Sequence, residues 1–162
     1  MPRNRSAATP ALQVLKAASI PYRVLEYEHD PRSESFGHEA VRKLGLDAMA
    51  VCKTLMADVD GVLVTAVVPI ASQLHLKSLA GALGAKYARM LDPATAQKLT
   101  GYVVGGISPL GQRRPHTCVV DASVTDLPLV YVSGGRRGLT IELAPADLIR
   151  TINAHTAAIT KT

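Results

Sequence analysis

Aromatic residues, cysteines and long apolar runs are all scarce in this sequence, and each scarcity argues against a class of function. Only 4% of the residues are aromatic, so the base-stacking surfaces of RRM and OB domains are not indicated. Cys52 and Cys118 form no CxxC pair and no zinc-ligand spacing, which argues against a disulfide framework or a structural zinc. The longest apolar-rich stretch, Val62–Ala71, is interrupted by Pro69 and is too short to cross a bilayer.

The remaining composition is that of a globular protein with one hydrophobic core. The chain has 162 residues, of which 48% are apolar and 19% charged. A second core would leave each half of so short a chain marginally stable. The basic N-terminus leads into no apolar segment of the kind found in secretory signals. Together with the few cysteines, this pattern predicts a single domain in the reducing cytoplasm.

Hydrophobic periodicity, capping residues and prolines predict alternating helices and strands. Helices are expected from Pro10 to before Pro21, over Phe36–Leu44 and Leu76–Leu83, between Asp92-Pro93 and Thr100-Gly101, and over Pro145–Ile152. Strands are expected over Tyr22–Tyr27, Val51–Ala57, Val62–Val68, Thr117–Asp121, Leu129–Val132 and Leu139–Leu143. Asp58–Gly61 is a hairpin signal between two of these strands. The predicted fold class is therefore mixed α/β, without a purely parallel sheet.

The positive charge is unevenly distributed along the chain. The formal net charge is +5; residues 1–25 carry +4, residues 26–60 carry −4 and residues 61–120 carry +5. One interpretation is an ordinary solvated surface with a modest excess of lysine and arginine. The other is an electrostatic footprint for a polyanion such as RNA.

Seven of the twelve glycines fall between residues 101 and 138 and form two loops. The first is Gly105–Gln112 and the second is Ser133–Gly138. Glycine allows backbone N–H groups to approach a ligand oxygen closely, which can hold a carbonyl or phosphate without side chains. Hairpin turns are the simpler interpretation, and both remain open.

Lys53 is unusual because strand periodicity places it among apolar residues. Side chains alternate along a strand, so Lys53 shares a face with Val51, Leu55 and Ala57. Either its ammonium extends to the solvent at the rim, or it is held for an anionic or carbonyl-bearing ligand. If it is buried, desolvation should lower its pKa.

No conventional catalytic group is indicated elsewhere. Cys52 and Cys118 lie in apolar strands and are predicted to be core thiols. The five histidines show no HxH or HxxxH spacing, so neither a metal nor another cofactor is expected. The sequence offers no obvious protein nucleophile or general base.

Four strings together carry a family resemblance. They are Tyr27-Glu28-His29-Asp30, Lys53-Thr54-Leu55, Tyr102–Gly111 (YVVGGISPLG) and Tyr131-Val132-Ser133-Gly134-Gly135. They resemble the YbaK branch (YbaK/EbsC family) of the prolyl-tRNA synthetase editing-domain superfamily, whose GxxxP element corresponds to Gly105–Pro109. The similarity runs from Thr9 to Ala157. It implies an editing domain over residues 9–157, built as a compact α/β domain on a curved mixed sheet, with a disordered tail at 1–8 and a short tail at 158–162.

The resemblance also implies an activity. Members of the family are free-standing deacylases that act in trans on mischarged tRNA, chiefly Cys-tRNA(Pro), with Cys-tRNA(Cys) as a further substrate. The cysteinyl thiol would attack its own ester, which agrees with the missing nucleophile. A transient ternary complex with tRNA and prolyl-tRNA synthetase is implied as well. Two alternatives remain: an editor of alanine or another small amino acid, and a tRNA 3′-end or nucleotide-binding module without turnover.

Matching the family's motifs residue by residue implies a site. Lys53 and Gly105 would be the catalytic residues: Lys53 would position the substrate, and the Gly105 backbone would face the ester carbonyl or ribose. The substrate-binding residues would be Tyr27, Thr54, Gly106, Ile107, Ser108, Pro109, Ser133 and Gly134.

Overall fold

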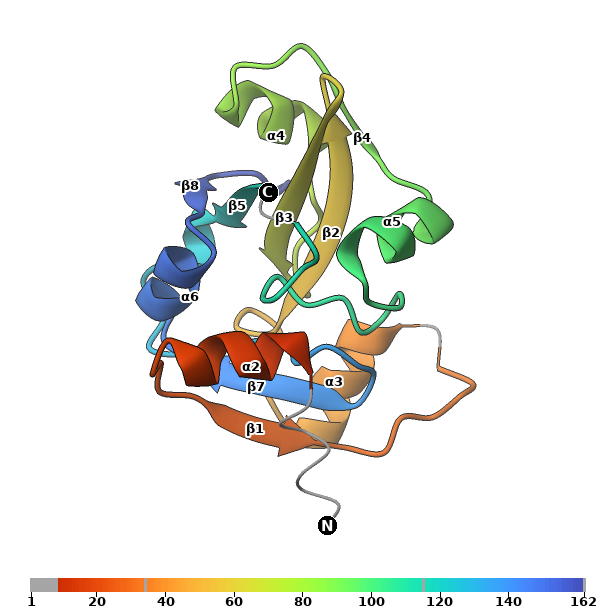
Figure 1. Cartoon of the computed structure of the whole chain (residues 1–162), viewed down its shortest axis with the longest axis vertical. Helices are drawn as coiled ribbons and strands as arrows, with labels where there is room; N and C mark the ends of the chain where they lie inside the picture. The colour runs from red at the N-terminus through yellow and green to blue at the C-terminus, as the bar shows by residue number, and fades with distance from the viewer. Residues whose placement is uncertain (1–8, 34, 115, 162) are drawn as a thin grey trace.

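The strands of this protein form two sheets within one mixed α/β domain (Figure 1). In the computed structural model, residues 9–33, 35–114 and 116–161 are described. The tail predicted at residues 1–8 lies outside them. The predicted mixed α/β class is confirmed. The resemblance implied a curved mixed sheet, and the strands are arranged in two sheets.

The bounds of the predicted helices and strands agree closely with the observed ones, whereas β4, β8 and a short 3-10 helix were not predicted. The helices are α2 (Pro10–Ala17), α3 (Phe36–Leu44), α4 (Leu76–Ala82), α5 (Pro93–Thr100), the 3-10 helix η1 (Ala122–Val124) and α6 (Pro145–Thr151). The strands are β1 (Arg23–Glu26), β2 (Cys52–Val59), β3 (Val62–Pro69), β4 (Ala88–Met90), β5 (Thr117–Asp121), β6 (Val130–Ser133), β7 (Leu139–Leu143) and β8 (His155–Ala157).

The smaller sheet has the antiparallel order β1-β7-β6, and α2 lies across it (Figure 1). Leu12 and Leu15 of α2 are buried in one cluster with Ile141 of β7 and Leu148 of α6. The helix begins as predicted, because the Thr9 hydroxyl accepts a hydrogen bond from the Leu12 N–H at 3.3 Å. Apolar burial therefore fixes α2 against the small sheet.

The larger sheet has the order β4-β2-β3-β5-β8. β3 lies between antiparallel β2 and parallel β5 and is therefore a central strand of this sheet. Asp60 and Gly61 join β2 to β3, and both have a positive φ, 49° and 86°. A two-residue turn with this geometry matches the twist of a hairpin, so the predicted hairpin is also confirmed.

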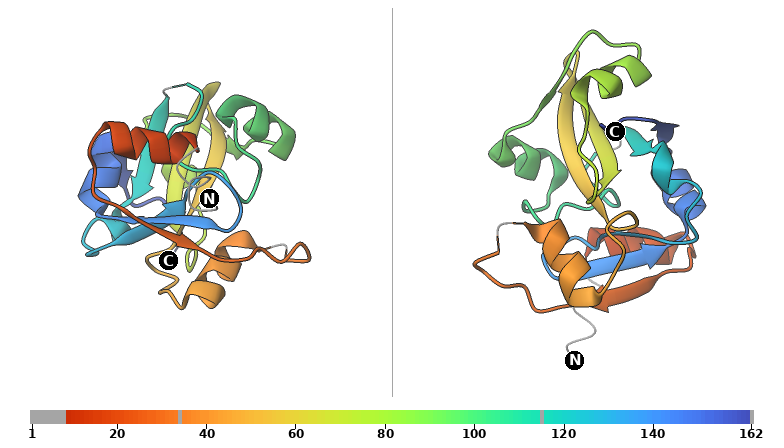
Figure 2. Two further views of the ribbon diagram at one scale, coloured as in Figure 1. Left: turned by 60° about the horizontal axis from the view of Figure 1, so that its bottom comes forward. Right: turned by 180° about the vertical axis from the view of Figure 1, so that it is seen from behind.

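The two sheets are linked at the start of β2. Val51 forms an isolated parallel bridge with Tyr131 of β6. The Tyr131 N–H donates to the carbonyl of Ala50 at 3.0 Å, and the Ile70 N–H donates to the carbonyl of Val51 at 2.7 Å. Figure 2 shows α3 beside this junction. Residues from both sheets and from α3 are thereby brought together.

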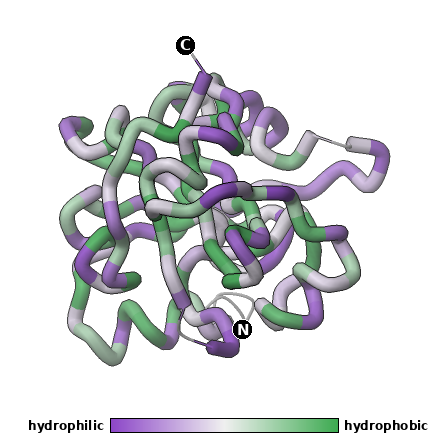
Figure 3. Tube along the Cα trace, turned by 90° about the horizontal axis from the view of Figure 1, so that it is seen from above, coloured by the Kyte–Doolittle hydropathy of each residue, from purple (hydrophilic) through white to green (hydrophobic). Residues whose placement is uncertain are grey.

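The loop between β1 and α3 projects from the body of the domain and is hydrophilic (Figure 3). His29 and Asp30 of this loop hydrogen-bond to the buried carboxylate of Glu39 on α3. Within the described ranges, no helix combines the length and apolarity that crossing a bilayer requires.

Candidate active site

A cavity of about 390 Å³ is lined by β2, the start of α3, the first glycine loop and the β6–β7 hairpin. β2 pairs with β4 only over Ala57–Val59, and Cys52–Met56, beyond that pairing, all line the cavity. Six of the ten predicted site residues line it as well: Tyr27, Lys53, Thr54, Gly105, Ile107 and Ser133.

Lys53 lies half-buried at the wall of this cavity. Desolvation lowers the pKa of Lys53 below 10.5, which is the direction predicted for a buried lysine. No carboxylate among the described residues offsets this effect. A bound carbonyl or anion would stabilise an ammonium in such a place, because it replaces the hydration lost on burial.

Thr54 brings an unpaired hydroxyl to the same cavity. Its Oγ1 is buried and has no hydrogen-bond partner among the described residues, although the side chain lines the cavity. A buried hydroxyl without a partner costs about 1–3 kcal/mol. A ligand group that hydrogen-bonds to Thr54 Oγ1 recovers this energy. The hydroxyl therefore suits ligand binding and does not stabilise the fold.

Gly105 is packed against the ring of Phe36 at the cavity wall. Its φ is +88°, and a Cβ atom there would lie 2.6 Å from the ring of Phe36. Both the backbone conformation and the close approach therefore require glycine. The loop backbone at this point can reach a substrate without an intervening side chain.

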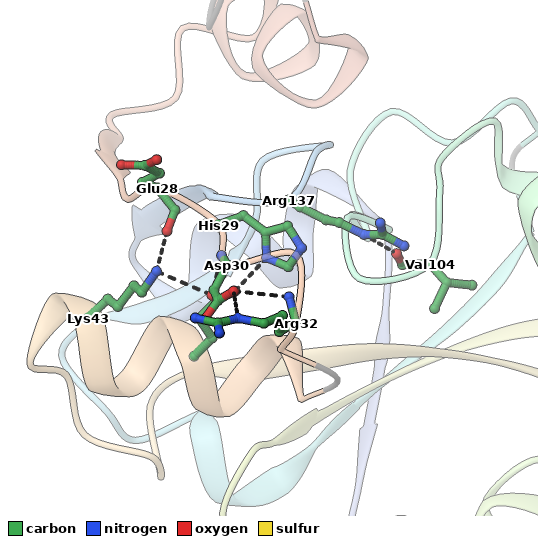
Figure 4. Close-up of polar contacts among 8 residues, drawn as sticks. Glu28, His29, Asp30, Arg32, Lys43, Val104 and Arg137 are labelled. Carbon is green, nitrogen blue, oxygen red and sulfur yellow. Dashed lines mark hydrogen bonds and ion pairs between the residues drawn. The ribbon is translucent and has the colours of Figure 1, made fainter.

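Two further side chains contact the ring of Phe36. The His29 ring centroid lies 5.5 Å from that of Phe36, and the Arg137 guanidinium lies 4.7 Å from the Phe36 ring centroid. Arg137 Nε also donates to the carbonyl of Val104 at 2.9 Å (Figure 4). These contacts join α3, the first glycine loop and the β6–β7 hairpin around one ring, which fixes the position of Gly105.

A buried carboxylate anchors the loop before α3. Glu39 is fully buried; its side chain lies 2.7 Å from His29 Nδ1, accepts from the Asp30 N–H at 2.8 Å and pairs with Lys43 at 3.3 Å. Figure 4 shows His29, Asp30 and Lys43 converging on this point. Burial acts to raise the pKa of Glu39, but the hydrogen bonds from Asp30, His29 and Lys43 outweigh it and lower the pKa. The ionised carboxylate thus holds the loop onto α3, next to Phe36.

One protein family accounts for the elements that form this site. The family model described as "Aminoacyl-tRNA editing domain" matches residues 33–151. The chain belongs to this family. The matched range contains β2, both glycine loops and α3, and so most of the cavity wall.

Individual relatives agree with this membership. The chain is 33% identical over 155 residues to "Putative Cys-tRNA(Pro)/Cys-tRNA(Cys) deacylase EbsC" of Enterococcus faecalis, covering 94% of this chain and 93% of the relative. It is also 28% identical over 126 residues to the uncharacterised protein YwhH of Bacillus subtilis, covering 77% of this chain and 78% of the relative. These matches and the family model confirm the resemblance predicted from the four strings.

Solved structures show the same fold. The hypothetical protein APE2540 superposes with a TM-score of 0.84 at 26% identity, over 94% of this chain and 99% of that one. A structure described as a putative trans-editing enzyme for prolyl-tRNA synthetase superposes with a TM-score of 0.85 at 22% identity, over 97% of this chain and 98% of that one. The two-sheet arrangement is therefore the fold of the editing domain.

Three predicted residues of the GxxxP loop lie outside the cavity wall of this editing domain. A Cβ atom on Gly106 would lie 2.7 Å from the Cα of Arg136, so the loop presses against the β6–β7 hairpin there. Ser108 is fully buried, and its hydroxyl accepts from the Leu110 N–H at 3.1 Å. Pro109 is buried as well. These residues shape the loop that carries Gly105, and their contact with substrate remains a prediction.

The second glycine loop closes the β6–β7 hairpin and also borders the cavity. The Gly134 N–H donates to the carbonyl of Leu139 at 2.8 Å, so Gly134 belongs to the hairpin closure and lies outside the wall. Ser133 and Arg136, on either side of it, line the cavity. The two interpretations of this loop, as a turn and as part of a site, are therefore compatible.

Both cysteines are buried thiols, as predicted. Burial, with a smaller effect of the Asp121 charge, raises the pKa of Cys52 to about 12. Burial also raises the pKa of Cys118. Cys52 borders the cavity, but its thiol is protonated at neutral pH and is a poor nucleophile.

Sequence reasoning missed several residues of the cavity wall, namely Phe36, His38, Met90 and Arg136. Phe36 is the single phenylalanine in the chain and stands at a predicted helix start, and this rarity is a signal that could have found it. Arg136 follows the pair Gly134-Gly135, for which only contacts of the backbone N–H groups with a ligand were predicted.

Proposed function

We propose that this protein is a trans-acting editing deacylase that removes cysteine from Cys-tRNA(Pro), using the thiol of the substrate as nucleophile. The observation that carries the proposal is the composition of the cavity wall. It offers a desolvated ammonium, an unpaired hydroxyl and a glycine backbone. The bordering thiol of Cys52 stays protonated, since its pKa is raised to about 12. Such a wall suits positioning of a substrate that supplies its own nucleophile.

The size of the cavity supports a small ligand. A volume of about 390 Å³ falls within the range of ~300–1,000 Å³ usual for small-molecule sites. The aminoacyl group and the terminal nucleotide of a tRNA are ligands of this class. The rest of the tRNA would remain outside the cavity.

The proposed reaction is an intramolecular transfer. The cysteinyl sulfur attacks the ester carbonyl carbon, a C–S bond forms, and the C–O bond to the terminal ribose breaks. The thiol proton ends on the ribose oxygen, and the products are a cyclic thiolactone and free tRNA. A thiol with a pKa of about 8.5 needs only a modest shift to supply thiolate near neutral pH, and correct placement contributes most of the acceleration.

Each wall residue has a role in this reaction. Lys53 positions the ester or the α-amino region, and the Gly105 backbone faces the developing oxyanion. The hydroxyl of Thr54 gains a partner from the substrate, while Tyr27 and Ser133 shape the pocket around the terminal adenosine. Serine and alanine lack the thiol, so selection among small amino acids is chemical and not steric alone.

The family membership leaves two other functions to be tested. An editor of alanine or another small amino acid would clear Ala-tRNA(Pro) faster than Cys-tRNA(Pro). A binding module would bind tRNA ends without turnover. We favour the cysteine deacylase because the relative from Enterococcus faecalis carries that description, and because the Cys52 thiol at the cavity wall is protonated. Such an editor would act with prolyl-tRNA synthetase in the cytoplasm, and Cys-tRNA(Cys) is a further substrate to include.

The test compares deacylation of Cys-, Ala- and Ser-tRNA(Pro) by the native protein and by Lys53→Ala. We expect release of cysteine alone, with kcat lowered by about 10²-fold in the variant because the ester loses its alignment. Lys77→Ala serves as the matched control, since Lys77 is exposed on α4 and should leave the rate unchanged.

Each contrary outcome has a distinct meaning. Faster release of alanine would identify the alternative editor. Binding of tRNA without release of any amino acid would identify a binding module. An unchanged rate in Lys53→Ala would overturn the role given to Lys53 while leaving the activity standing.

A further inference from the structure

The chain between Pro93 and Val120 contains no aspartate or glutamate. It includes Lys98 at the end of α5 and Arg113 in the loop before β5, and both side chains are exposed. Arg137 of the β6–β7 hairpin is exposed as well. We refer to Lys98, Arg113 and Arg137 together as the basic strip.

A series of contacts joins the members of the basic strip. Arg113 Nη1 donates to the carbonyl of Lys98 at 3.4 Å, so its guanidinium lies against the end of α5. The neighbouring Gln97 accepts from the Val104 N–H at 2.9 Å. The Val104 carbonyl in turn accepts from Arg137 Nε at 2.9 Å (Figure 4). These hydrogen bonds connect the elements that carry the strip, namely α5, the loop before β5, the first glycine loop and the hairpin.

The strip ends at the mouth of the cavity. The Arg137 guanidinium lies 4.7 Å from the centroid of the Phe36 ring, and both Phe36 and Val104 line the cavity. A polyanion bound at Lys98 and Arg113 would thus find a further cation, Arg137, beside the cavity.

No member of the basic strip forms an ion pair with a carboxylate of the described residues. Among the described residues, Arg23, Arg32, Arg89, Arg136 and Arg150 each pair with an aspartate or glutamate. Lys98, Arg113 and Arg137 form no such ion pair within that part of the chain. Their charge is therefore available to an external anion, unlike that of most other described arginines.

We propose that the basic strip binds the phosphates of the acceptor arm of the tRNA whose terminal nucleotide enters the cavity. This inference rests on the proposed function. An RNA strand fits better than an acidic protein because the cavity accepts only the end of the tRNA, and the adjoining nucleotides must lie where the strip begins. Guanidinium groups match phosphate oxygens with paired hydrogen bonds.

The experiment separates binding along the strip from chemistry in the cavity. The double variant Lys98→Gln/Arg113→Gln is compared with the native protein on two substrates, Cys-tRNA(Pro) and the cysteine 3′-ester of adenosine. Its control, Lys77→Gln/Lys161→Gln, also removes two exposed positive charges. Affinity for uncharged tRNA(Pro) is measured in parallel by fluorescence anisotropy at several salt concentrations.

We expect the double variant to lose roughly tenfold in affinity for tRNA and in kcat/KM on Cys-tRNA(Pro), and to keep its rate on the small ester. The slope of log K against log salt should become shallower by about 0.7–0.9 for each phosphate that the variant no longer neutralises. The control should match the native protein in every measurement.

Three results would overturn the proposal that the basic strip binds tRNA. Unchanged tRNA affinity and salt slope would do so directly. An equal loss on the small ester would show that the substitutions act through the cavity. Loss of binding to prolyl-tRNA synthetase with intact tRNA binding would make the strip a protein-docking surface. If the native protein cleaves neither ester, the proposed function fails, and the anisotropy measurement still decides the strip.

Discussion

A Cβ atom on Gly105 would lie 2.6 Å from the ring of Phe36, so these two residues together exclude any side chain at this point of the cavity wall. The ring is contacted by both His29 and Arg137. It therefore cannot move aside without loosening both the loop before α3 and the β6–β7 hairpin. The place of the Gly105 backbone depends on this packing as well as on the local motif.

Gly105→Ala should therefore lower both stability and activity. The φ of +88° is strained for alanine, at about 1–3 kcal/mol, and displacement of the loop should lower kcat by about 10²-fold. Urea unfolding and deacylation assays measure the two effects. Gly81→Ala is the control: Gly81 lies in α4 with open space around its Cβ position, so this variant should gain about 0.5–1 kcal/mol. Full activity in Gly105→Ala would contradict the role of the loop.

Thr54→Val should make the protein more stable and less active. Valine removes a buried hydroxyl that lacks a partner among the described residues, which should raise the free energy of unfolding by about 1–3 kcal/mol. The same change removes a group proposed to bond to substrate, so KM should rise while the fold is intact. Thr54→Ser keeps the hydroxyl and should restore KM. A Thr54→Val protein that is destabilised would show that the hydroxyl has a structural partner.

Lys53→Met should stabilise the protein most at neutral pH. The folded-state pKa of Lys53 lies below 10.5 because of desolvation, so at neutral pH the native state holds an unfavourably buried charge. As the pH rises from that lowered value toward 10.5, the unfolded chain binds more protons than the folded one, and the native protein gains stability. The advantage of Lys53→Met should therefore shrink over this range. Thermal unfolding between pH 7 and 10.5 tests it, with exposed Lys77→Met as control; an advantage that grows with pH would be contrary to a desolvated Lys53.

Gln112→Ala should loosen the loop that carries Gly105. Gln112 Nε2 donates to the carbonyl of Ser108 at 2.9 Å, and its Oε1 accepts from Thr65 of β3 at 3.3 Å. Loss of this link between the loop and the central strand should cost about 1–3 kcal/mol and lower kcat more than it changes KM. Hydrogen exchange of the loop amides and steady-state kinetics measure these effects. Gln73→Ala, at an exposed position, is the control, and unaltered exchange in the Gln112 variant would refute the link.

Much of the fold could be predicted because its signals are local. Thr9-Pro10 and Asp92-Pro93 cap helices through contacts within one turn, and Asp60-Gly61 sets a hairpin through its own backbone. β4 and β8 escaped prediction because each has only three residues and forms through pairing with distant strands. Neither stretch alternates between apolar and polar residues over the length that a strand signal needs.

Only those site residues that belong to a recognisable sequence pattern could be predicted. Lys53 stood out as a charge on an apolar strand face, and Gly105 as part of a glycine-rich string. The motif could not show that Ser108 faces inward while Gly105 borders the cavity, since this depends on how the loop packs against β3 and the hairpin. Phe36 borders the cavity beside a loop that the buried Glu39 holds in place, and such a tertiary contact leaves no local pattern.

The central claim is that the substrate's own thiol is the nucleophile. The most direct measurement is single-turnover deacylation of Cys-tRNA(Pro) and of the same tRNA charged with S-methylcysteine, with the released product identified by mass spectrometry. We predict rapid release of cysteine as the thiolactone and almost no release of S-methylcysteine, which lacks the attacking S–H. Release of both amino acids at similar rates, as free acids, would show that water is the nucleophile and would contradict the account.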